Sequence, residues 1–287
     1  MSINDTTPPA PERPEARHLG HRSPLPDRYD PTLLVRVERQ LARKANRVDT
    51  SSSPFEGFDV WHAYEVACMQ QAGLPIEGIL KVIYPASSPY IVESKSLKLY
   101  LHSLNNVAMG FTRPACIAQL VSTVQQDLRL LLNTDVRCQF FDHYTAPCDF
   151  EGWQPYETAT PTSAAQENAL DHELHFHTRL LRSRCRVTGQ PDWGNLYVHM
   201  QGERLPHPQE LLQQVVALRN GFHFHEEICE LLYSALYQKY LPALLTVCTL
   251  YTRRGGIDIN PCRTNNLNDL PQGLTDLNAL THPSWRQ

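Results

Sequence analysis

The chain reads Arg184-Cys185-Arg186-Val187-Thr188-Gly189-Gln190-Pro191-Asp192-Trp193-Gly194, which sets a thiol seven residues before a carboxylic acid. Gly tolerates unusual backbone angles and Pro has no N–H for a sheet, so a strand carrying Cys185 is expected to turn at Gly189 and Pro191. That turn would bring Asp192 back toward the sulfur. The structural alternative is a buried Cys beside a turn Asp, because free Cys usually behaves as a small buried hydrophobe.

The residues beside this thiol suggest chemistry for it. Arg184 and Arg186 flank Cys185, and a neighbouring cation favours the thiolate, which is the nucleophilic form. A nearby acid such as Asp192 can then give a proton to whatever the sulfur attacks.

The elements around this stretch follow a repeated order. In the second half, hydrophobic periodicity predicts strands at 173–187, 195–201, 244–253 and 256–260, and helices at 208–219 and 225–240. A fainter version in the first half has strands at 78–84, 90–101 and 136–141 and a helix at 114–132. We therefore expect an α+β fold of two related modules, each an antiparallel sheet with helices packed on one face.

The expected boundaries divide the chain into three parts. Residues 1–50 form a Pro-rich arm and lead-in, residues 51–157 the N-terminal module, and residues 158–287 the C-terminal module. The first 30 residues contain too little apolar material to order themselves alone. Residues 158–168 are expected to connect the modules.

Composition excludes several classes of protein. The net charge of −4 argues against a broad electrostatic grip on nucleic acid. No signal-like start and no apolar run of membrane-spanning length occur in the sequence. The eight cysteines form no Cys-x-x-Cys pair, so we expect reduced thiols in a cytoplasmic protein. Without a Gly-x-Gly-x-x-Gly motif, a dinucleotide would not bind in a Rossmann crevice.

A second cluster of polar residues is Glu93-Ser94-Lys95-Ser96-Leu97-Lys98-Leu99-Tyr100. Read as a strand, it places Glu93 and Lys95 on one face and Ser94 and Lys98 on the other. Lysines and hydroxyls at this density can hold phosphate oxygens. An amphipathic strand with a solvated polar face is the structural alternative.

Two further clusters lie near the C-terminus. In Phe224-His225-Glu226-Glu227, Glu226 can accept two hydrogen bonds from a guanine-like edge and His225 can assist proton transfer, although carboxylates at a helix start also have a purely structural role. In the run from Tyr251 to Pro261, Arg253 and Arg254 precede two glycines, and can bring guanidinium and backbone N–H groups to a phosphate. A charged hairpin turn is the alternative there.

Three histidines, His172, His175 and His177, lie close together in the sequence. On a strand, His175 and His177 share a face. No Cys or carboxylate completes an obvious site in the sequence, and neutral strand histidines are common, so we expect no metal.

Together the four clusters resemble, in chain order, the signatures of the QueF family of NADPH-dependent 7-cyano-7-deazaguanine reductases. The Glu-Ser-Lys-Ser-x-Lys motif and the Cys-x6-Asp spacing carry the resemblance, which runs from about Leu19 to the C-terminal region. It implies the long form with two tandem tunnelling-fold modules. It also implies a homodimer, in which the edges of the barrels are paired. The implied reaction reduces a nitrile to an aminomethyl group with NADPH as co-substrate, in queuosine tRNA modification.

The resemblance also implies a role for each matching residue. Cys185 would be the nucleophile that forms a covalent thioimide, Asp192 the proton donor, and His225 the group beside the nitrile. The substrate would be held by Val92, Glu93, Ser94, His225 and Glu226. The cofactor would be held by Ser94, Lys95, Arg254 and Gly255.

The residues make chemical sense of these roles. A nitrile accepts hydride poorly, whereas thiolate addition with protonation at nitrogen gives a carbon that accepts it more easily. Because Asp192 must hold a proton at that moment, we expect a raised pKa for this acid and a lowered pKa for the Cys185 thiol.

One position departs from the family's pattern. Many relatives carry a second Cys two residues after the Glu of Phe-His-Glu, where this chain has Ile228, with Cys229 one residue further. One residue rotates a helical side chain by about 100°, so a disulfide between Cys229 and Cys185 is not implied.

Two other functions remain open from the residues alone. One is a zinc-dependent purine or pterin enzyme of the cyclohydrolase type, and the other is a non-catalytic purine-binding module. The molecule bound in each case is a small one.

Overall fold

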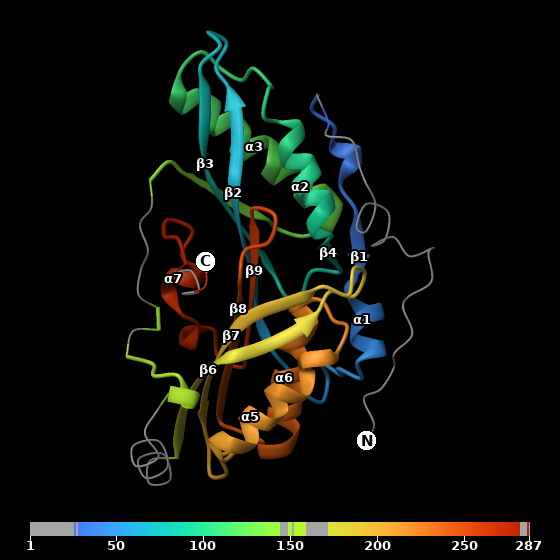
Figure 1. Cartoon of the computed structure of the whole chain (residues 1–287), viewed down its shortest axis with the longest axis vertical. Coiled ribbons are helices and arrows are strands. Elements are labelled where there is room, and N and C mark those ends of the chain that lie inside the picture. The colour runs from blue at the N-terminus through green and yellow to red at the C-terminus, as the bar shows by residue number, and fades with distance from the viewer. Residues whose placement is uncertain are drawn as a thin grey trace.

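The computed structural model describes residues 26, 28–143, 149–150, 152–158, 172–281 and 286. Seven antiparallel strands form one sheet in the order β5-β3-β2-β9-β8-β7-β6, and β1 (Arg36–Glu38) pairs with β4 (Tyr90–Val92) in a separate ribbon. The sheet runs along the long axis of the molecule, with α2 and α3 beside one half and α5 and α6 beside the other (Figure 1). The Pro-rich arm up to residue 25 and most of the connector lie outside the described residues.

The first half of the sheet contains β2 (Glu56–Met69), β3 (Pro75–Pro85) and β5 (Arg137–Phe141). Helix α3 (Arg113–Leu132) begins at the N-cap Thr112, whose hydroxyl accepts from the Ala115 N–H. Its buried side chains recur every four residues, at Cys116, Leu120, Val124, Leu128 and Leu132. Burial of each such apolar side chain stabilises the folded chain by about 1.5–3 kcal/mol.

The prediction of a strand at 90–101 is wrong beyond residues 90–92. The chain leaves β4 at Val92 and enters helix α2 (Ser94–Ser103), with Glu93 as its N-cap. The Glu93 side chain accepts hydrogen bonds from the backbone N–H groups of Lys95 and Ser96, which satisfies donors that a helix start leaves open. The two faces assigned to a strand in this segment therefore do not exist.

The second half of the sheet contains β6 (Glu173–Arg184), β7 (Pro191–Gln201), β8 (Leu244–Tyr251) and β9 (Ile257–Thr264). Helices α5 (Pro208–Ala217) and α6 (His225–Tyr240) pack on it. These elements confirm the predicted ones apart from their ends. The α+β fold of antiparallel strands with helices on one face is confirmed as well.

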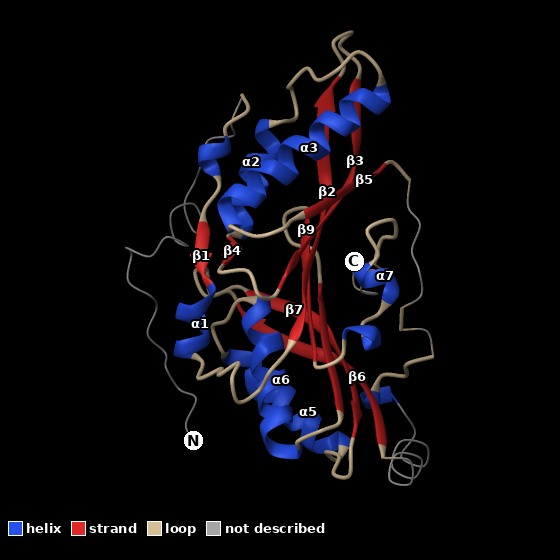
Figure 2. Cartoon of the chain, turned by 180° about the vertical axis from the view of Figure 1, so that it is seen from behind, coloured by secondary structure: helices blue, strands red, loops and turns tan. Residues whose placement is uncertain are grey.

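The two faces of the sheet are covered differently. Leu196 and Val198 of β7 alternate with Tyr197, so their side chains lie on the opposite face of the sheet from the Tyr197 side chain. Leu196 and Val198 belong to the core under α5 and α6. Tyr197 packs instead on the opposite face with Leu270 and Leu274 of the C-terminal segment. Figure 2, from behind, shows α7 (Gln272–Thr275) apart from the other helices.

Short elements complete the described chain. They are η2 (Pro31–Leu33), α1 (Arg39–Ala45), η3 (Tyr156–Thr158), η4 (Leu218–Asn220) and η5 (Leu267–Asp269). The buried Lys81 of β3 donates to the carbonyls of Gly273, Asp276 and Ala279, which fastens the C-terminal segment to the sheet. Within the described ranges, no helix is long and apolar enough to cross a membrane.

Candidate active site

A cavity of about 610 Å³ lies where the N-termini of α2 and α6 meet the turns after β6 and β8. All ten residues that the sequence analysis assigned to a site line it: Val92, Glu93, Ser94, Lys95, Cys185, Asp192, His225, Glu226, Arg254 and Gly255. Segments about 160 residues apart in the sequence thus contribute to one cavity.

The Cys185 turn has the expected geometry. Strand β6 ends at Arg184, and the Cys185 carbonyl accepts from the Gly189 N–H at 3.0 Å, while the Cys185 N–H donates to the Gln190 carbonyl at 2.8 Å. Gly189 has a φ of +66°, a left-handed conformation that favours glycine. Strand β7 then begins at Pro191 and presents Asp192 to the cavity that Cys185 also lines.

Asp192 has two basic partners. Its Oδ1 accepts from Arg254, and its Oδ2 lies 3.6 Å from His225 Nε2. Burial alone would raise the pKa of Asp192, but the hydrogen bond and charge of His225 and the charge of Arg254 outweigh burial and lower it. The expectation of a raised Asp192 pKa is therefore wrong, because the sequence did not indicate that His225 and Arg254 both reach this carboxylate.

The two arginines beside Cys185 have other partners. Arg186 donates to Glu227 at 2.7 Å, and Arg184 donates to the Asn220 side chain at 3.2 Å. The sequence analysis expected both guanidinium groups to favour a thiolate at Cys185. Because consecutive side chains diverge at the end of a strand, adjacency in sequence did not predict their contacts.

The start of α6 supplies His225 and Glu226. The His225 ring stacks on Tyr251 with centroids 3.7 Å apart, which fixes its plane. Its Nδ1 is buried and has no hydrogen-bond partner among the described residues. Glu226 is 3% exposed, and burial together with repulsion from Asp59 raises its pKa to about 8.

Glu93 faces the cavity from the start of α2. It is buried, and the loss of water raises its pKa, although the two backbone hydrogen bonds to its carboxylate act in the opposite direction. Glu93 and Glu226 thus both lie at helix N-termini, where the backbone favours negative charge. Each carboxylate can therefore stabilise the start of its helix and also contact a molecule in the cavity.

The cavity has a cationic side. Lys95 and Lys98 of α2 line it together with Arg254. A Cβ on Gly255 would lie 2.9 Å from Lys98 Nζ, and Gly255 and Gly256 have φ values of +58° and +81°. The two glycines therefore form a tight turn that keeps space beside the ammonium group. Basic groups and bare backbone N–H groups in this arrangement can bind phosphate oxygens.

Arg253 does not lie on the cationic side of the cavity. Its guanidinium lies 4.4 Å above the Tyr64 ring centroid, and it is not among the described residues that line the cavity. The expectation that both arginines of this turn reach one phosphate is wrong. Neighbouring side chains of the hairpin leave on opposite faces.

Several parts of the wall were not indicated by the sequence, among them Trp61, His102 and His223. Lys98, which the sequence placed in a possible phosphate-binding cluster, also lines the cavity. Lys95, Lys98 and His102 follow each other at spacings of three and four, a helical signal that the strand interpretation concealed.

A buried ion network near Glu226 was also missed. It joins Arg39, Arg43 and Arg263 to Asp59 and Glu230. No local pattern indicates it, because its members come from four separate elements.

Cys229 points away from the cavity. It is fully buried, its thiol lies 3.4 Å from the Val247 carbonyl, and burial raises its pKa. The structure therefore agrees with the sequence in providing no disulfide partner for Cys185 at this position.

Comparison with known proteins identifies the family. Residues 25–140 match the family described as "Nitrile reductase, 7-cyano-7-deazaguanine-reductase N-term", and residues 191–269 match "QueF-like protein". A solved "archaeosine synthase QueF-Like in the apo form" aligns with a TM-score of 0.31 and 17% identity, over 32% of this chain and 92% of its own.

Curated relatives match over nearly their full length. An "NADPH-dependent 7-cyano-7-deazaguanine reductase" of Coxiella burnetii is 36% identical, over 95% of this chain and 97% of its own. Proteins of the same name from Acinetobacter baylyi and Rickettsia bellii are 32% and 34% identical, over 89% and 87% of this chain and 96% and 93% of their own. The chain therefore belongs to the family of NADPH-dependent 7-cyano-7-deazaguanine reductases.

Proposed function

We propose that this protein reduces the nitrile of 7-cyano-7-deazaguanine to 7-aminomethyl-7-deazaguanine through a thioimide on Cys185. The observation that carries the proposal is the single cavity lined by a cysteine, an acid, two buried glutamates and a cationic cluster. The overall reaction consumes two NADPH and two protons for each amine formed. Relatives of the same name support the reductase over the zinc-dependent and non-catalytic alternatives.

The first step forms a carbon–sulfur bond. Asp192, whose pKa is lowered in the free protein, accepts the proton of the Cys185 thiol as the sulfur adds to the nitrile carbon. Asp192 then gives this proton to the nitrile nitrogen, so the thioimide forms without any other proton source. His225, 3.6 Å from Asp192, lies where it can hold the protonated nitrogen in place.

The remaining steps reduce the carbon twice. Each of two NADPH molecules would supply one hydride to this carbon, the first to the thioimide and the second to the imine that forms when the carbon–sulfur bond breaks. Departure of the sulfur leaves the Cys185 thiolate, and of the two protons consumed one restores the thiol and the other goes to the amine nitrogen. Glu93 and Glu226 accept hydrogen bonds from the deazaguanine, and Val92 and Ser94 contact its ring. Ser94, Lys95, Arg254 and Gly255 bind the phosphates of NADPH.

NADPH consumption tests the proposed reaction. With 7-cyano-7-deazaguanine, the protein should oxidise two NADPH for each aminomethyl product measured by mass spectrometry. Cys185→Ala should abolish the oxidation, whereas Cys138→Ala, a buried cysteine of β5 outside the cavity lining, should retain it. Product without Cys185, or no nitrile-dependent oxidation by the native chain, would overturn the proposal.

We further propose a homodimer in the cytoplasm. Strands β5 and β6 end the described sheet, and pairing of these ends between two copies would leave no open edge. The proposed chemistry also needs Cys185 as a thiol, which a reducing compartment maintains. Light scattering of the purified chain should give twice the mass of one chain, and a monomeric mass would contradict the dimer.

A further inference from the structure

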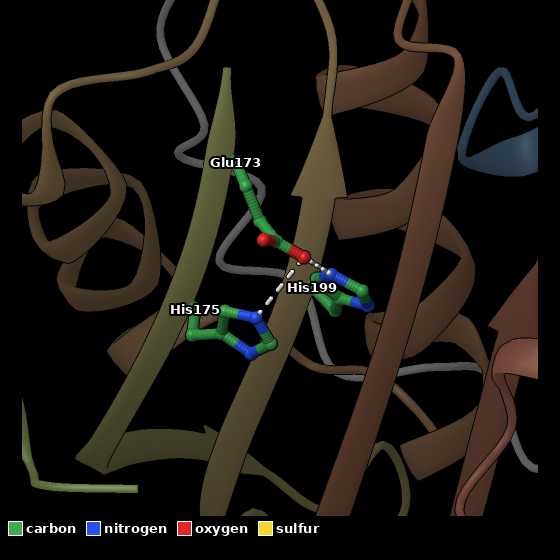
Figure 3. Close-up of side chains that lie close together, drawn as sticks. All are labelled: Glu173, His175 and His199. Carbon is green, nitrogen blue, oxygen red and sulfur yellow. Dashed lines mark hydrogen bonds and ion pairs between the residues drawn. The ribbon is translucent and has the colours of Figure 1, made fainter. Parts of the chain in front are cut away.

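A second cluster of chemically reactive side chains lies on the other face of the sheet. Glu173 and His175 project from β6, and His199 projects from β7 (Figure 3). His175 and His199 are direct cross-strand partners. Their neighbours Leu174 and Val198 belong to the core under α5 and α6, so the cluster lies on the face away from these helices.

The ligand atoms of the cluster converge. Glu173 Oε1 lies 2.7 Å from His199 Nε2 and 3.3 Å from His175 Nε2, and all three ligand atoms lie within 4.8 Å of one another. A tetrahedral zinc ion with bonds of about 2.0–2.1 Å separates its ligands by roughly 3.3 Å. Small side-chain rotations would therefore be enough to fit an ion between these atoms.

Further contacts orient the ligands. His199 Nδ1 lies 2.7 Å from Asp269 Oδ1, and the Gln201 side-chain amide donates to Glu173 Oε1 at 2.8 Å. A carboxylate on the far nitrogen of a histidine is the usual outer contact of a metal ligand, because it fixes the ring and raises its basicity. The His175 side chain is 48% exposed, so an ion has access from solvent.

We propose that Glu173, His175 and His199 bind one divalent transition-metal ion, with Zn²⁺ as the best match. Two imidazole nitrogens and one carboxylate oxygen suit zinc and its neighbours and do not suit Mg²⁺, which prefers oxygen ligands. Water would complete the coordination. The ion would join β6 to β7 and, through Asp269, to η5, and it takes no part in the reduction on the opposite face.

Calorimetric titration of the tag-free, EDTA-treated full chain tests the site. Zn²⁺ should bind with a stoichiometry of one and Mg²⁺ should not. His175→Ala and His199→Ala should each weaken Zn²⁺ binding by tenfold or more, and Asp269→Asn by about 10- to 100-fold. His143→Ala, which changes an exposed histidine paired with Asp142, is the matched control and should bind Zn²⁺ as the native chain does.

A second readout separates metal binding from misfolding. His175 is half-exposed, so His175→Ala should keep the native circular dichroism spectrum while it loses the Zn²⁺-dependent rise in Tm. Absence of saturable Zn²⁺ binding by the native chain would overturn the proposal. Equal Zn²⁺ affinity of the native chain, His175→Ala and His199→Ala would also overturn it.

Discussion

In the proposed first step, Asp192 must carry a negative charge in order to accept the thiol proton. His225 and Arg254 keep the buried carboxylate ionised, because both lower its pKa and the Arg254 guanidinium donates a hydrogen bond to it. The same arginine is proposed to bind NADPH. One residue thus connects the cofactor side of the cavity with the thiol side.

Arg254→Gln should therefore move the acid limb of the pH profile for thioimide formation to higher pH. Loss of the cation raises the pKa of Asp192, so the carboxylate is lost at a higher pH. The rate of adduct formation, followed from about pH 3 to 8, checks this. Arg253→Gln, whose guanidinium lies over Tyr64, should leave the limb in place. An unchanged limb in Arg254→Gln would contradict the assigned coupling.

Glu226 presents the opposite case, an acid whose pKa is raised to about 8 by burial and by Asp59. Only its ionised form accepts two hydrogen bonds from a guanine-like edge. The affinity for 7-aminomethyl-7-deazaguanine, which has no nitrile to react, should therefore rise with pH up to about 8, with release of a proton on binding.

Glu226→Gln should remove this pH dependence and weaken binding at pH 8 by about 10- to 100-fold, because it leaves a ligand donor without an acceptor. Calorimetry at several pH values measures both effects. Glu227→Gln changes the adjacent carboxylate, which faces Arg186, and should retain the slope. The same slope in Glu226→Gln as in the native chain would refute the role.

At the scale of elements, α2 shows where the sequence misled. Its buried side chains Leu97, Tyr100 and Leu101, together with Leu104 at its C-cap, have the helical spacing of three, four and seven. The alternation of polar and apolar residues from Ser96 to Leu99 concealed that pattern. The decisive feature is the Glu93 cap, whose contacts with two backbone N–H groups become visible only once the helix is known.

Glu93→Ala should remove both capping hydrogen bonds of α2. The expected cost is about 0.5–2 kcal/mol of stability, the usual range for loss of an N-cap. Because Lys95 and Lys98 lie in the first turns of α2, KM for NADPH should rise as well. Thermal unfolding and steady-state kinetics measure the two effects.

Lys44→Ala in the last turn of α1 is a matched control, because it changes an exposed helical residue outside the cavity lining. It should alter neither quantity. A Glu93→Ala variant with native Tm would show that the cap is dispensable.

The turns were easier to predict than α2. Gly189 and the Gly255–Gly256 pair require left-handed backbone, and the sequence alone identified both turns. The contacts that those turns create, such as Arg254 with Asp192, could not be predicted, because they join residues 62 positions apart.

Across the whole molecule, one buried ion network connects the two halves of the sheet. Glu230 of α6 binds Arg43 of α1 and Arg263 of β9, and Arg263 also binds Asp59 of β2. Burial would raise the pKa of Glu230, but Arg263, Arg43 and Arg39 lower it to about 2. The periodicity of each element predicted the sheet, whereas this network depends on how distant elements pack.

Because of this network, the free energy of unfolding should decrease in acid. Since the pKa of Glu230 is lower in the folded chain, the unfolded chain binds more protons between pH 4.5 and 2, and stability falls as pH falls through this range. Glu230→Gln should cost about 3–5 kcal/mol above pH 4.5, because it removes the carboxylate partner of the buried Arg43 and leaves Asp59 alone to pair with Arg39 and Arg263.

Unfolding of the native chain and Glu230→Gln at several pH values checks this. The difference in free energy should shrink toward pH 2. Glu210→Gln, an exposed carboxylate paired with Lys239, should show little difference at any pH. A constant difference for Glu230→Gln across the range would contradict the linkage.

The central claim is that Cys185 adds to the nitrile carbon in a cavity built by both halves of the chain. Intact-mass measurement after incubation with 7-cyano-7-deazaguanine, without NADPH, tests it most directly. The native chain should gain the mass of one ligand, and Cys185→Ala should gain none. A native chain that shows no adduct at saturating ligand, or a Cys185→Ala chain that still forms one, would contradict the claim.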